Sequence, residues 1–445
     1  MFLDRIWRWL DDRLGLEPLL RTISARGLNP VYSLGGLSFL FFLIQAVTGV
    51  VLALYYSPTP ETAYDSVQKI STALRYGWMI RGVHFYAANC MIIAAILHMG
   101  RSYFRGAYKK PQELNWVVGV LIGAVAIMSG FTGYVLRWDQ EAVGASGIGK
   151  GLAVSIPQIG IVLMKFLWGQ SDADMAHRFF TIHTLLLPGL IASLLAVHYF
   201  MVRKQGVEVL LGELNLAPIV IGSLLVFVSV FPVRLGPKFD PMNPPTVLEP
   251  EWFFMGLYQF IKTQSIQPIH GVVLIVAFGL FLVAIPFVDR GSERSALRRP
   301  LFTALALFMI VEFLGLTVYG YLSPGQMGTF SDSRFAEAFI LTNLVALGVI
   351  VLVFAGSRRA LRNVRNTTGR TGRFSFRSGR VSEGRVALAV GLVFLESFLV
   401  FEAILAHVGG SERIFGILAG LGFLCFAALL YVASVLFFTQ NDKHP

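Results

Sequence analysis

Four histidines in two apolar stretches of this chain stand in pairs of nearly equal spacing: His84 with His98, and His183 with His198. On an α-helix, 14 residues rise about 21 Å and 15 residues about 22.5 Å, so each pair lies roughly on one helix face. Two such helices, side by side and pointing the same way, would offer two bis-imidazole sites near the two sides of a ~30 Å hydrocarbon core. The spacing therefore predicts two haem irons held one above the other in a membrane.

A lone histidine on an apolar helix face is ordinarily a satisfied core residue. Two matched pairs among only eight histidines in 445 residues favour a functional interpretation, because ionisable groups are costly inside membrane segments. A transporter with a histidine proton relay is an alternative, and it predicts a protein without haem.

Two glycine pairs repeat the histidine spacing. Gly35 and Gly49 are 14 residues apart, and so are Gly119 and Gly133. A planar macrocycle pressed against a helix needs a missing side chain at the contact, which would make these four residues cofactor-binding. Close helix packing explains the same pattern, and among 44 glycines some matches arise by chance.

Composition predicts an all-α, polytopic membrane protein. The chain is 55% hydrophobic and only 14% charged, about half the charge of an ordinary soluble domain. The net charge of +11 comes largely from arginines in short loops beside apolar runs, so membrane topology explains it better than nucleic-acid binding. The two cysteines, Cys90 and Cys425, lie in apolar runs, and no CxxCH motif for covalent c-type haem attachment is present.

Ten apolar runs are long enough to be membrane spans. They lie near residues 32–56, 79–100, 114–136, 179–202, 216–235, 271–288, 301–322, 335–356, 386–408 and 413–438. With the N-terminus inside, arginine and lysine concentrate in every second loop, which predicts that both termini lie on the inside. The fifth span, closed by Pro232, and the tenth, with only Lys443 on its inner flank, are the weakest.

Other segments complete the predicted organisation. Residues 1–31 are expected to form an amphipathic surface helix. The Arg-rich inside loop 357–385 is a topology signal that could also contact anionic lipid. The outer loops 137–178, with an interfacial hairpin, and 236–270 are long and hydrophobic. Such backbone at membrane depth must be buried or line a cavity, so a lipid-soluble substrate is expected there.

The motifs together resemble cytochrome b of quinol:cytochrome c (or plastocyanin) oxidoreductases. The resemblance rests on GWMIRGVH, GYVLRWDQ, RFFTIHT, HYFMVRKQG and the two histidine pairs. It implies a diheme four-helix bundle over residues 32–212, similar to cytochrome b6 in its 15-residue second spacing, fused to a subunit IV-like half over 213–325 that contains PEWFF. The extension 326–445, with about three spans, has no counterpart beyond an eighth helix.

The resemblance also implies roles for individual residues. His84 and His183 would ligate a low-potential outer haem b, and His98 and His198 a high-potential inner one. Arg81 and Arg101 would suit haem propionates, with interfacial or positive-inside anchors as the alternative. Glu251, between Pro250 and Trp252 of PEWFF, would accept a proton from quinol at a catalytic outer site, while Phe253 replaces the usual tyrosine.

By this resemblance the function is a Q cycle coupled to proton translocation in a prokaryotic cytoplasmic membrane. The implied partners are quinone, a Rieske iron–sulfur protein, a c-type cytochrome or other soluble acceptor, and a second copy of the complex. A diheme membrane anchor of a dehydrogenase or hydrogenase is the alternative function, although such anchors lack PEWFF and its long loop.

The sequence departs from the family on the inner side. Ser33 stands where the b6f type attaches a third haem through a cysteine, which leaves only a noncovalent third haem open. Arg21 and Thr22 fall where acids are expected near the inner quinone, so Arg203 and Lys204 are the candidates there. Four further intramembrane ionisable residues have open roles, as interfacial groups, partner contacts or a proton path: Glu312, Glu396, Glu402 and His407.

Overall fold

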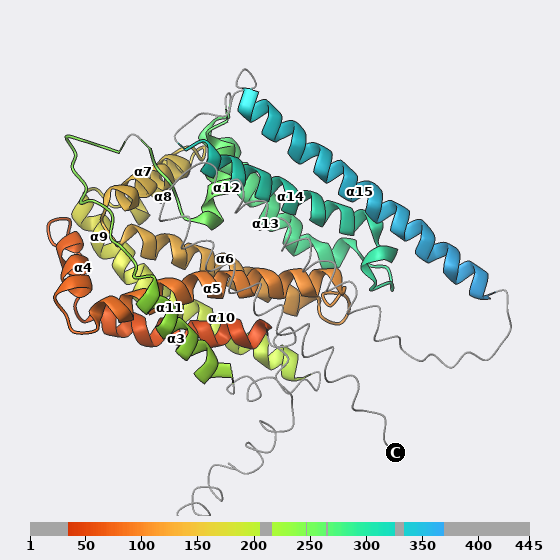
Figure 1. Cartoon of the computed structure of the whole chain (residues 1–445), viewed down its shortest axis with the longest axis horizontal. Coiled ribbons are helices and arrows are strands. Elements are labelled where there is room, and N and C mark those ends of the chain that lie inside the picture. The colour runs from red at the N-terminus through yellow and green to blue at the C-terminus, as the bar shows by residue number, and fades with distance from the viewer. Residues whose placement is uncertain (1–33, 205–215, 246, 264–265, 325–332, 369–445) are drawn as a thin grey trace, which may run out of the picture.

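The computed structural model describes residues 34–204, 216–245, 247–263, 266–324 and 333–368, and these ranges are predominantly helical (Figure 1). Seven helices within them are long and apolar enough to cross a membrane. In hydrocarbon, a near-continuous apolar run can satisfy its backbone polar groups only by coiling into a helix or closing a barrel. The predicted all-α, polytopic fold class is therefore confirmed.

Four long helices form the first bundle. They are α3 (Leu34–Ala53), α5 (Gly77–Phe104), α6 (Glu113–Val135) and a fourth made of α9 (Asp172–Thr181), the π-helical turn η1 (Ile182–Leu186) and α10 (Leu187–Arg203). Helix α3 packs on α5, and α10 packs on α6. The histidine pairs lie on α5 and on the η1–α10 helix.

The remaining helices pack beside this bundle. They are α11 (Ala217–Val230), α13 (Pro268–Val288), α14 (Pro300–Leu322) and α15 (Ser333–Thr368). Helix α11 is the predicted fifth span; it is only 14 residues long and ends before Pro232. Its Val228 packs against Gly82 of α5, so it belongs spatially to the first bundle. Helix α15 packs on α14 and extends beyond it (Figure 1).

One predicted boundary is wrong. Helix α15 continues to Thr368, so residues 357–368 are helical although the sequence predicts a loop from residue 357. Arginine, alanine and leucine favour helix, and they continue the helix after the apolar run ends. The rest of that loop, the predicted spans 386–408 and 413–438, and the N-terminal segment through Ser33 lie outside the described residues.

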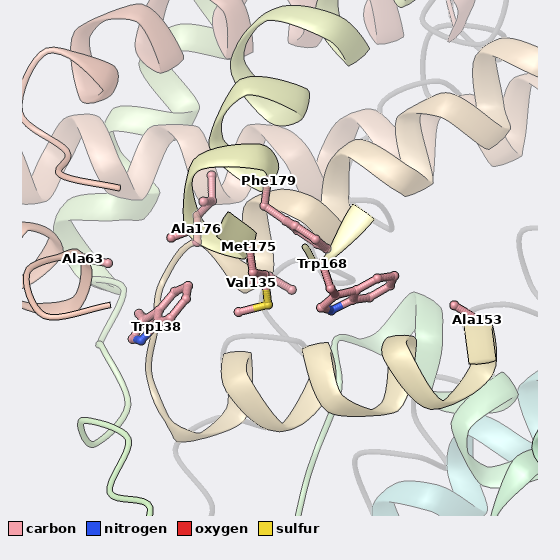
Figure 2. Close-up of a cluster of buried hydrophobic side chains, with 9 residues drawn as sticks. Ala63, Val135, Trp138, Ala153, Trp168, Met175, Ala176 and Phe179 are labelled. Carbon is pink, nitrogen blue, oxygen red and sulfur yellow. The ribbon is translucent and has the colours of Figure 1, made fainter. Parts of the chain in front are cut away.

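Short helices cover one end of the bundle. They are α4 (Ala63–Thr72), which the sequence analysis did not predict, α7 (Gln140–Val154), α8 (Gly160–Leu167) and α12 (Trp252–Ile261). The α7–α8 pair is the hairpin expected between residues 137 and 178. Trp138, Trp168, Met175 and Phe179 are buried together and hold this hairpin against the ends of α6 and α9 (Figure 2). We refer to this end as the outer end.

The opposite, inner end holds a buried ionic cluster. Asp289, after α13, accepts hydrogen bonds from Lys109 at 2.6 Å, Tyr108 at 2.6 Å and Arg299 at 3.0 Å. Tyr108 and Lys109 belong to the α5–α6 turn, whereas Arg299 precedes α14. The cluster therefore ties the first bundle to the helices that follow it, with its charges compensated locally as burial requires.

Candidate functional site

The outer histidine pair lies within the first bundle. The ring centroids of His84 and His183 are 6.4 Å apart, and the ring planes are inclined by 76°. Two imidazoles that bind one metal ion, each through a bond of about 2 Å, place their centroids about 6 Å apart. The separation of this pair thus suits bis-imidazole ligation of one iron.

Hydrogen bonds orient both outer rings. The Nδ1 atom of His84 lies 2.8 Å from Thr48 Oγ1, and this hydroxyl donates its proton to the Ile44 carbonyl at 2.6 Å. The Nδ1 atom of His183 lies 3.0 Å from the Ser129 carbonyl oxygen. Both oxygens accept from Nδ1–H, which leaves the lone pair on Nε2 of each ring. This is the tautomer that a metal-ligating histidine needs.

The inner pair has a different environment. His98 lies against α3 and His198 against α6. The Nδ1 atom of His98 is buried and makes no hydrogen bond in the described residues, and the buried Nδ1 of His198 lies beside the backbone of Asn115. Among the residues described, the inner rings therefore lack the Nδ1 contact with a threonine hydroxyl that each outer ring has.

Each of the four glycines singled out in the sequence faces one of the four histidines. A Cβ added at Gly35 would lie 3.1 Å from His98 Cε1, and one added at Gly49 would lie 3.3 Å from His84 Cε1. A Cβ added at Gly119 would lie 3.5 Å from His198 Cε1, and one added at Gly133 would lie 2.5 Å from His183 Cε1. Helix α3 thus faces the rings of α5, and α6 faces those of η1–α10. The absence of side chains here fits a planar group between the helices.

The second histidine pair owes its alignment to a π-helical turn. His183 lies in η1, where one additional residue is accommodated in the helix. On an unbroken α-helix a separation of 15 residues ends about 60° past full turns. The wider turn accommodates the extra residue, so that His183 and His198 lie on one face of their helix, as His84 and His98 do on α5.

The PEWFF segment packs on the two helices beside the outer pair. Trp252 donates from Nε1 to Asn89 Oδ1 of α5 at 2.8 Å, five residues beyond His84. Phe253 lies against Gly130 of α6, where a Cβ would be 3.2 Å from its Cζ atom. Gly130 directly follows Ser129, which binds His183. The segment is thereby anchored to both helices that flank the outer pair.

Charged groups gather beside Glu251. Arg137, after α6, lies 3.4 Å from Asp139, 3.4 Å from Glu141 and 3.8 Å from Glu251, all between side-chain nitrogen and oxygen atoms. Its guanidinium lies 4.1 Å over the ring of Tyr134. Burial lowers the pKa of Arg137, but the surrounding carboxylates and Tyr134 outweigh burial and raise it. The guanidinium is therefore a permanent cation.

The predicted propionate and inner-site residues remain predictions. Arg81 is 9% exposed and donates to Ser71 Oγ and to the carbonyls of Val233 and Arg234, which joins α5 to the loop after α11. Arg101 lies one turn beyond His98 on α5. Arg203 is the last residue of α10. Pro250 directly precedes Glu251, which stands at the N-cap position of α12.

Comparison with known proteins agrees with this geometry. Residues 20–206 match the family described as cytochrome b/b6/petB, and residues 238–341 match cytochrome b(C-terminal)/b6/petD. The cytochrome b subunit of menaquinol:cytochrome c reductase from Bacillus subtilis (strain 168) is 40% identical over 220 residues, which are 46% of this chain and 98% of that protein. The chain belongs to the cytochrome b/b6 family.

Two further relatives extend the comparison. Cytochrome b6 of Heliobacterium mobile is 42% identical over 208 residues, covering 45% of this chain and 98% of its own length. A solved structure described as a hyperthermophilic respiratory Complex III aligns with a TM-score of 0.62 and 26% identity, over 79% of this chain and 98% of that chain. Membership in this family makes the chain a membrane-embedded electron-transport protein of the haem b type.

Sequence reasoning missed the residues that orient the histidines. Thr48 and Thr132 were not singled out, yet Thr48 binds His84 and Thr132 Oγ1 lies 3.1 Å from His183 Nδ1. Each directly precedes one of the glycines, in TG dipeptides 48–49 and 132–133. That repetition in two helices was the available signal. Nothing comparable marked Arg137, because its partner Glu251 lies more than 100 residues away in the sequence.

Proposed function

We propose that this chain is the diheme subunit of a quinol-oxidising cytochrome bc complex in a prokaryotic cytoplasmic membrane. The observation that carries the proposal is the pairing of four histidines with four glycines at two depths of one helical bundle. The proposed units are the bundle 32–212, the subunit IV-like half 213–325 and the extension 326–445. Both termini are assigned to the inside by the distribution of arginine and lysine.

The histidines would hold one haem b at each depth, His84 with His183 and His98 with His198. Bound there, the two haems would supply one-electron transfer between an outer quinol site and an inner quinone site. The outer rings offer Nε2 because Thr48 and Ser129 accept from Nδ1. Such hydrogen bonds raise the basicity of the ligating nitrogen and favour the oxidised metal, which agrees with a low potential for the outer site.

Glu251 is the proposed proton acceptor at the outer quinol site. It stands at the N-cap position of α12, and Trp252 and Phe253 pack on the helices that carry the outer histidines. A partly buried carboxylate beside aromatic side chains can take a proton from quinol and release it to the outer aqueous phase, which couples oxidation to proton translocation. The relatives from Bacillus and Geobacillus carry menaquinol in their names, so menaquinol is the first substrate to test.

The expected partners follow from the same family. A Rieske iron–sulfur protein and a c-type cytochrome subunit or soluble acceptor would receive electrons on the outer side, within a homodimer of the complex. On the inner side, Arg203 and Lys204 at the end of α10 are the proposed quinone-site groups. A noncovalent third haem remains a secondary proposal, because Ser33 cannot form a thioether.

The alternative of a dehydrogenase or hydrogenase anchor is disfavoured. The second family match, over residues 238–341, includes the PEWFF segment and α12. This segment is bonded through Trp252 to Asn89 of α5, the helix that carries His84 and His98, which supports the proposal. A simple diheme anchor would give this loop no role.

A redox titration of the purified complex tests the proposal, with haem quantified by pyridine haemochrome. We expect two b-type haems per chain with separated midpoint potentials. His183→Leu should remove the component of lower potential, and His198→Leu the component of higher potential. Absence of haem from an intact preparation, or loss of both components in each variant despite normal assembly, would contradict it.

A further inference from the structure

The turn between α6 and α7 places Arg137 at the outer site. Trp138, the next residue, adopts a left-handed backbone with φ of 57° although it is not a glycine, and its side chain is buried. Such backbone persists only where surrounding contacts hold it, and it is concentrated at functional sites. Here the turn directs the chain so that Arg137 meets Glu251 of the PEWFF segment, more than 100 residues away in the sequence.

Three carboxylates approach the guanidinium of Arg137, but they are held unequally. The side chain of Asp139 is 1% exposed and also accepts from the backbone nitrogens of Ala142 at 2.9 Å and Gly236 at 3.3 Å. Glu141 follows Arg137 by one helical turn and approaches it to 3.4 Å. Glu251 makes the longest of the three ion pairs, at 3.8 Å, with its side chain 19% exposed.

We propose that Arg137 is a positioning residue for quinol oxidation, holding the Glu251 carboxylate ready to accept a proton and releasing it once it is protonated. The proposal rests on the proposed function, in which Glu251 is the acceptor at the outer site. In this role Arg137 does not contact quinol and does not itself accept or donate a proton.

The arrangement of charge supports this role. In the proton transfer, one quinol O–H bond breaks and one O–H bond forms on Glu251, leaving quinolate. The protonated carboxyl no longer attracts the guanidinium, whereas Asp139 and Glu141 continue to satisfy it. Arg137 therefore keeps its position while Glu251 leaves and returns. Other titratable or charged groups near this cluster belong to α5, α6, α14 and the segment before α12: Arg81, Tyr134, Tyr321 and Glu249.

The test compares Arg137→Gln, Arg137→Lys, Glu251→Gln and the double variant in the purified complex, with menaquinol as substrate. Initial rates are measured against pH and quinol concentration. The matched control is Lys238→Gln, which removes a half-exposed outer cation paired with Asp65 and not with Glu251. A second readout is the infrared carbonyl band of protonated Glu251, identified by its loss in Glu251→Gln.

Removing the cation makes the carboxylate easier to protonate, so the acidic limb of the rate profile should move to higher pH in Arg137→Gln. The infrared band should appear at correspondingly higher pH. We expect kcat to fall about tenfold, less than the roughly 10²–10⁴-fold effect of losing acid–base catalysis outright, with little change in KM. Arg137→Lys should restore part of the rate, and the double variant should be no slower than Glu251→Gln.

The inference fails if Glu251→Gln impairs oxidation while Arg137→Gln keeps the pH profile and infrared band of Lys238→Gln. If Arg137→Gln does not assemble with haem, Arg137→Lys decides the matter: a shifted profile supports the role, and an unchanged rate and profile overturns it. If instead Glu251→Gln itself oxidises quinol with an unchanged pH profile, the proposed function of Glu251 fails, and the role of Arg137 with it.

Discussion

The outer and inner histidines differ at the scale of single residues. On the outer side, Thr48 and Thr132 lie beside Nδ1 atoms, and each directly precedes the glycine that faces the same ring. On the inner side, Leu34 and Val118 stand in the corresponding positions. One helix turn therefore supplies both the space for a flat group and the hydrogen bond that orients its ligand, but only at the outer depth.

Gly133→Ala should abolish or strongly reduce outer haem binding. The added Cβ would lie 2.5 Å from His183 Cε1, closer than real Cβ contacts, so the ring must move from its position. Gly123→Ala on the same helix is the matched control, because its Cβ meets nothing within 4 Å. Haem content per chain and the low-potential component of the titration measure the effect. Equal haem content in the two variants would contradict the clearance role.

At the scale of elements, the π-helical turn η1 reconciles two different histidine spacings. The 14-residue step on α5 needs only regular α-helix, whereas the 15-residue step passes through η1. A π turn inside an α-helix costs hydrogen-bond geometry and is frequent at functional sites. Its position at His183 places the irregularity beside the proposed outer iron.

Deletion of Leu185 should leave both haems bound. The deletion converts the step to 14 residues, and η1 can then close as regular α-helix with both histidines on one face. Leu185 is 71% exposed, so little packing is lost. Deletion of Ile93 in α5 is the control, because it turns His98 by about 100° relative to His84 and should remove haem. The pyridine haemochrome assay distinguishes them, and haem loss in the Leu185 deletion would count against the geometric role of η1.

The inner ionic cluster connects elements from both halves of the chain. Asp289→Asn would leave Lys109 and Arg299 buried without their anion, and we expect a loss of about 3–5 kcal/mol, as for other broken buried pairs. Asp65→Asn, which breaks the half-exposed pair with Lys238, should cost about 0–1 kcal/mol. Denaturant or thermal unfolding of the purified complex measures both, and similar losses in the two variants would contradict the argument.

The same cluster should make stability depend on acid. Burial raises the pKa of Asp289, but hydrogen bonds from Lys109, Tyr108 and Arg299 outweigh it and lower the pKa overall. The stabilisation by ionised Asp289 is therefore fully present at a pH above the ordinary pKa of aspartate. It is lost as the pH falls through the lowered pKa of Asp289. Part of the acid destabilisation of the wild-type protein should be missing in Asp289→Asn. Parallel acid profiles of the two proteins would argue against it.

At the scale of the whole molecule, the two ends of the bundle have different structures. The outer end carries the short helices α4, α7, α8 and α12. The first three share one apolar cluster, and α12 packs on α14. The inner end is closed by the α5–α6 turn and the segment around η3 (Ala296–Arg298), joined through buried charges. A quinol site is therefore expected under the covering helices, between membrane and water.

Single-cysteine variants should show this orientation in intact cells. In a background lacking Cys90 and Cys425, a cysteine at Gln158 in the α7–α8 turn should react with a membrane-impermeant maleimide from outside. A cysteine at the exposed Glu293, before η3, should react only after the membrane is opened. The reverse pattern would overturn the assignment of both termini to the inside, which rests on charge distribution alone.

The long helices, the two histidine pairs and the four glycines could all be predicted from the sequence. Length, hydropathy and spacing along one helix are local properties, and a membrane leaves an apolar run few structures to adopt. Hence the predicted spans that fall within the described residues coincide with helices. The fifth, α11, ends at Val230, shortly before Pro232. The helical continuation of α15 was missed because hydropathy does not report helix propensity beyond the membrane.

Contacts between distant segments became visible only in the folded chain. The pairing of each glycine with one histidine depends on the antiparallel packing of α3 on α5 and of α6 on α10. The ion pair of Arg137 with Glu251 joins residues that are far apart in the chain. Contacts across long loops carry no periodic signal, because their distances are set by chain folding rather than by helix geometry.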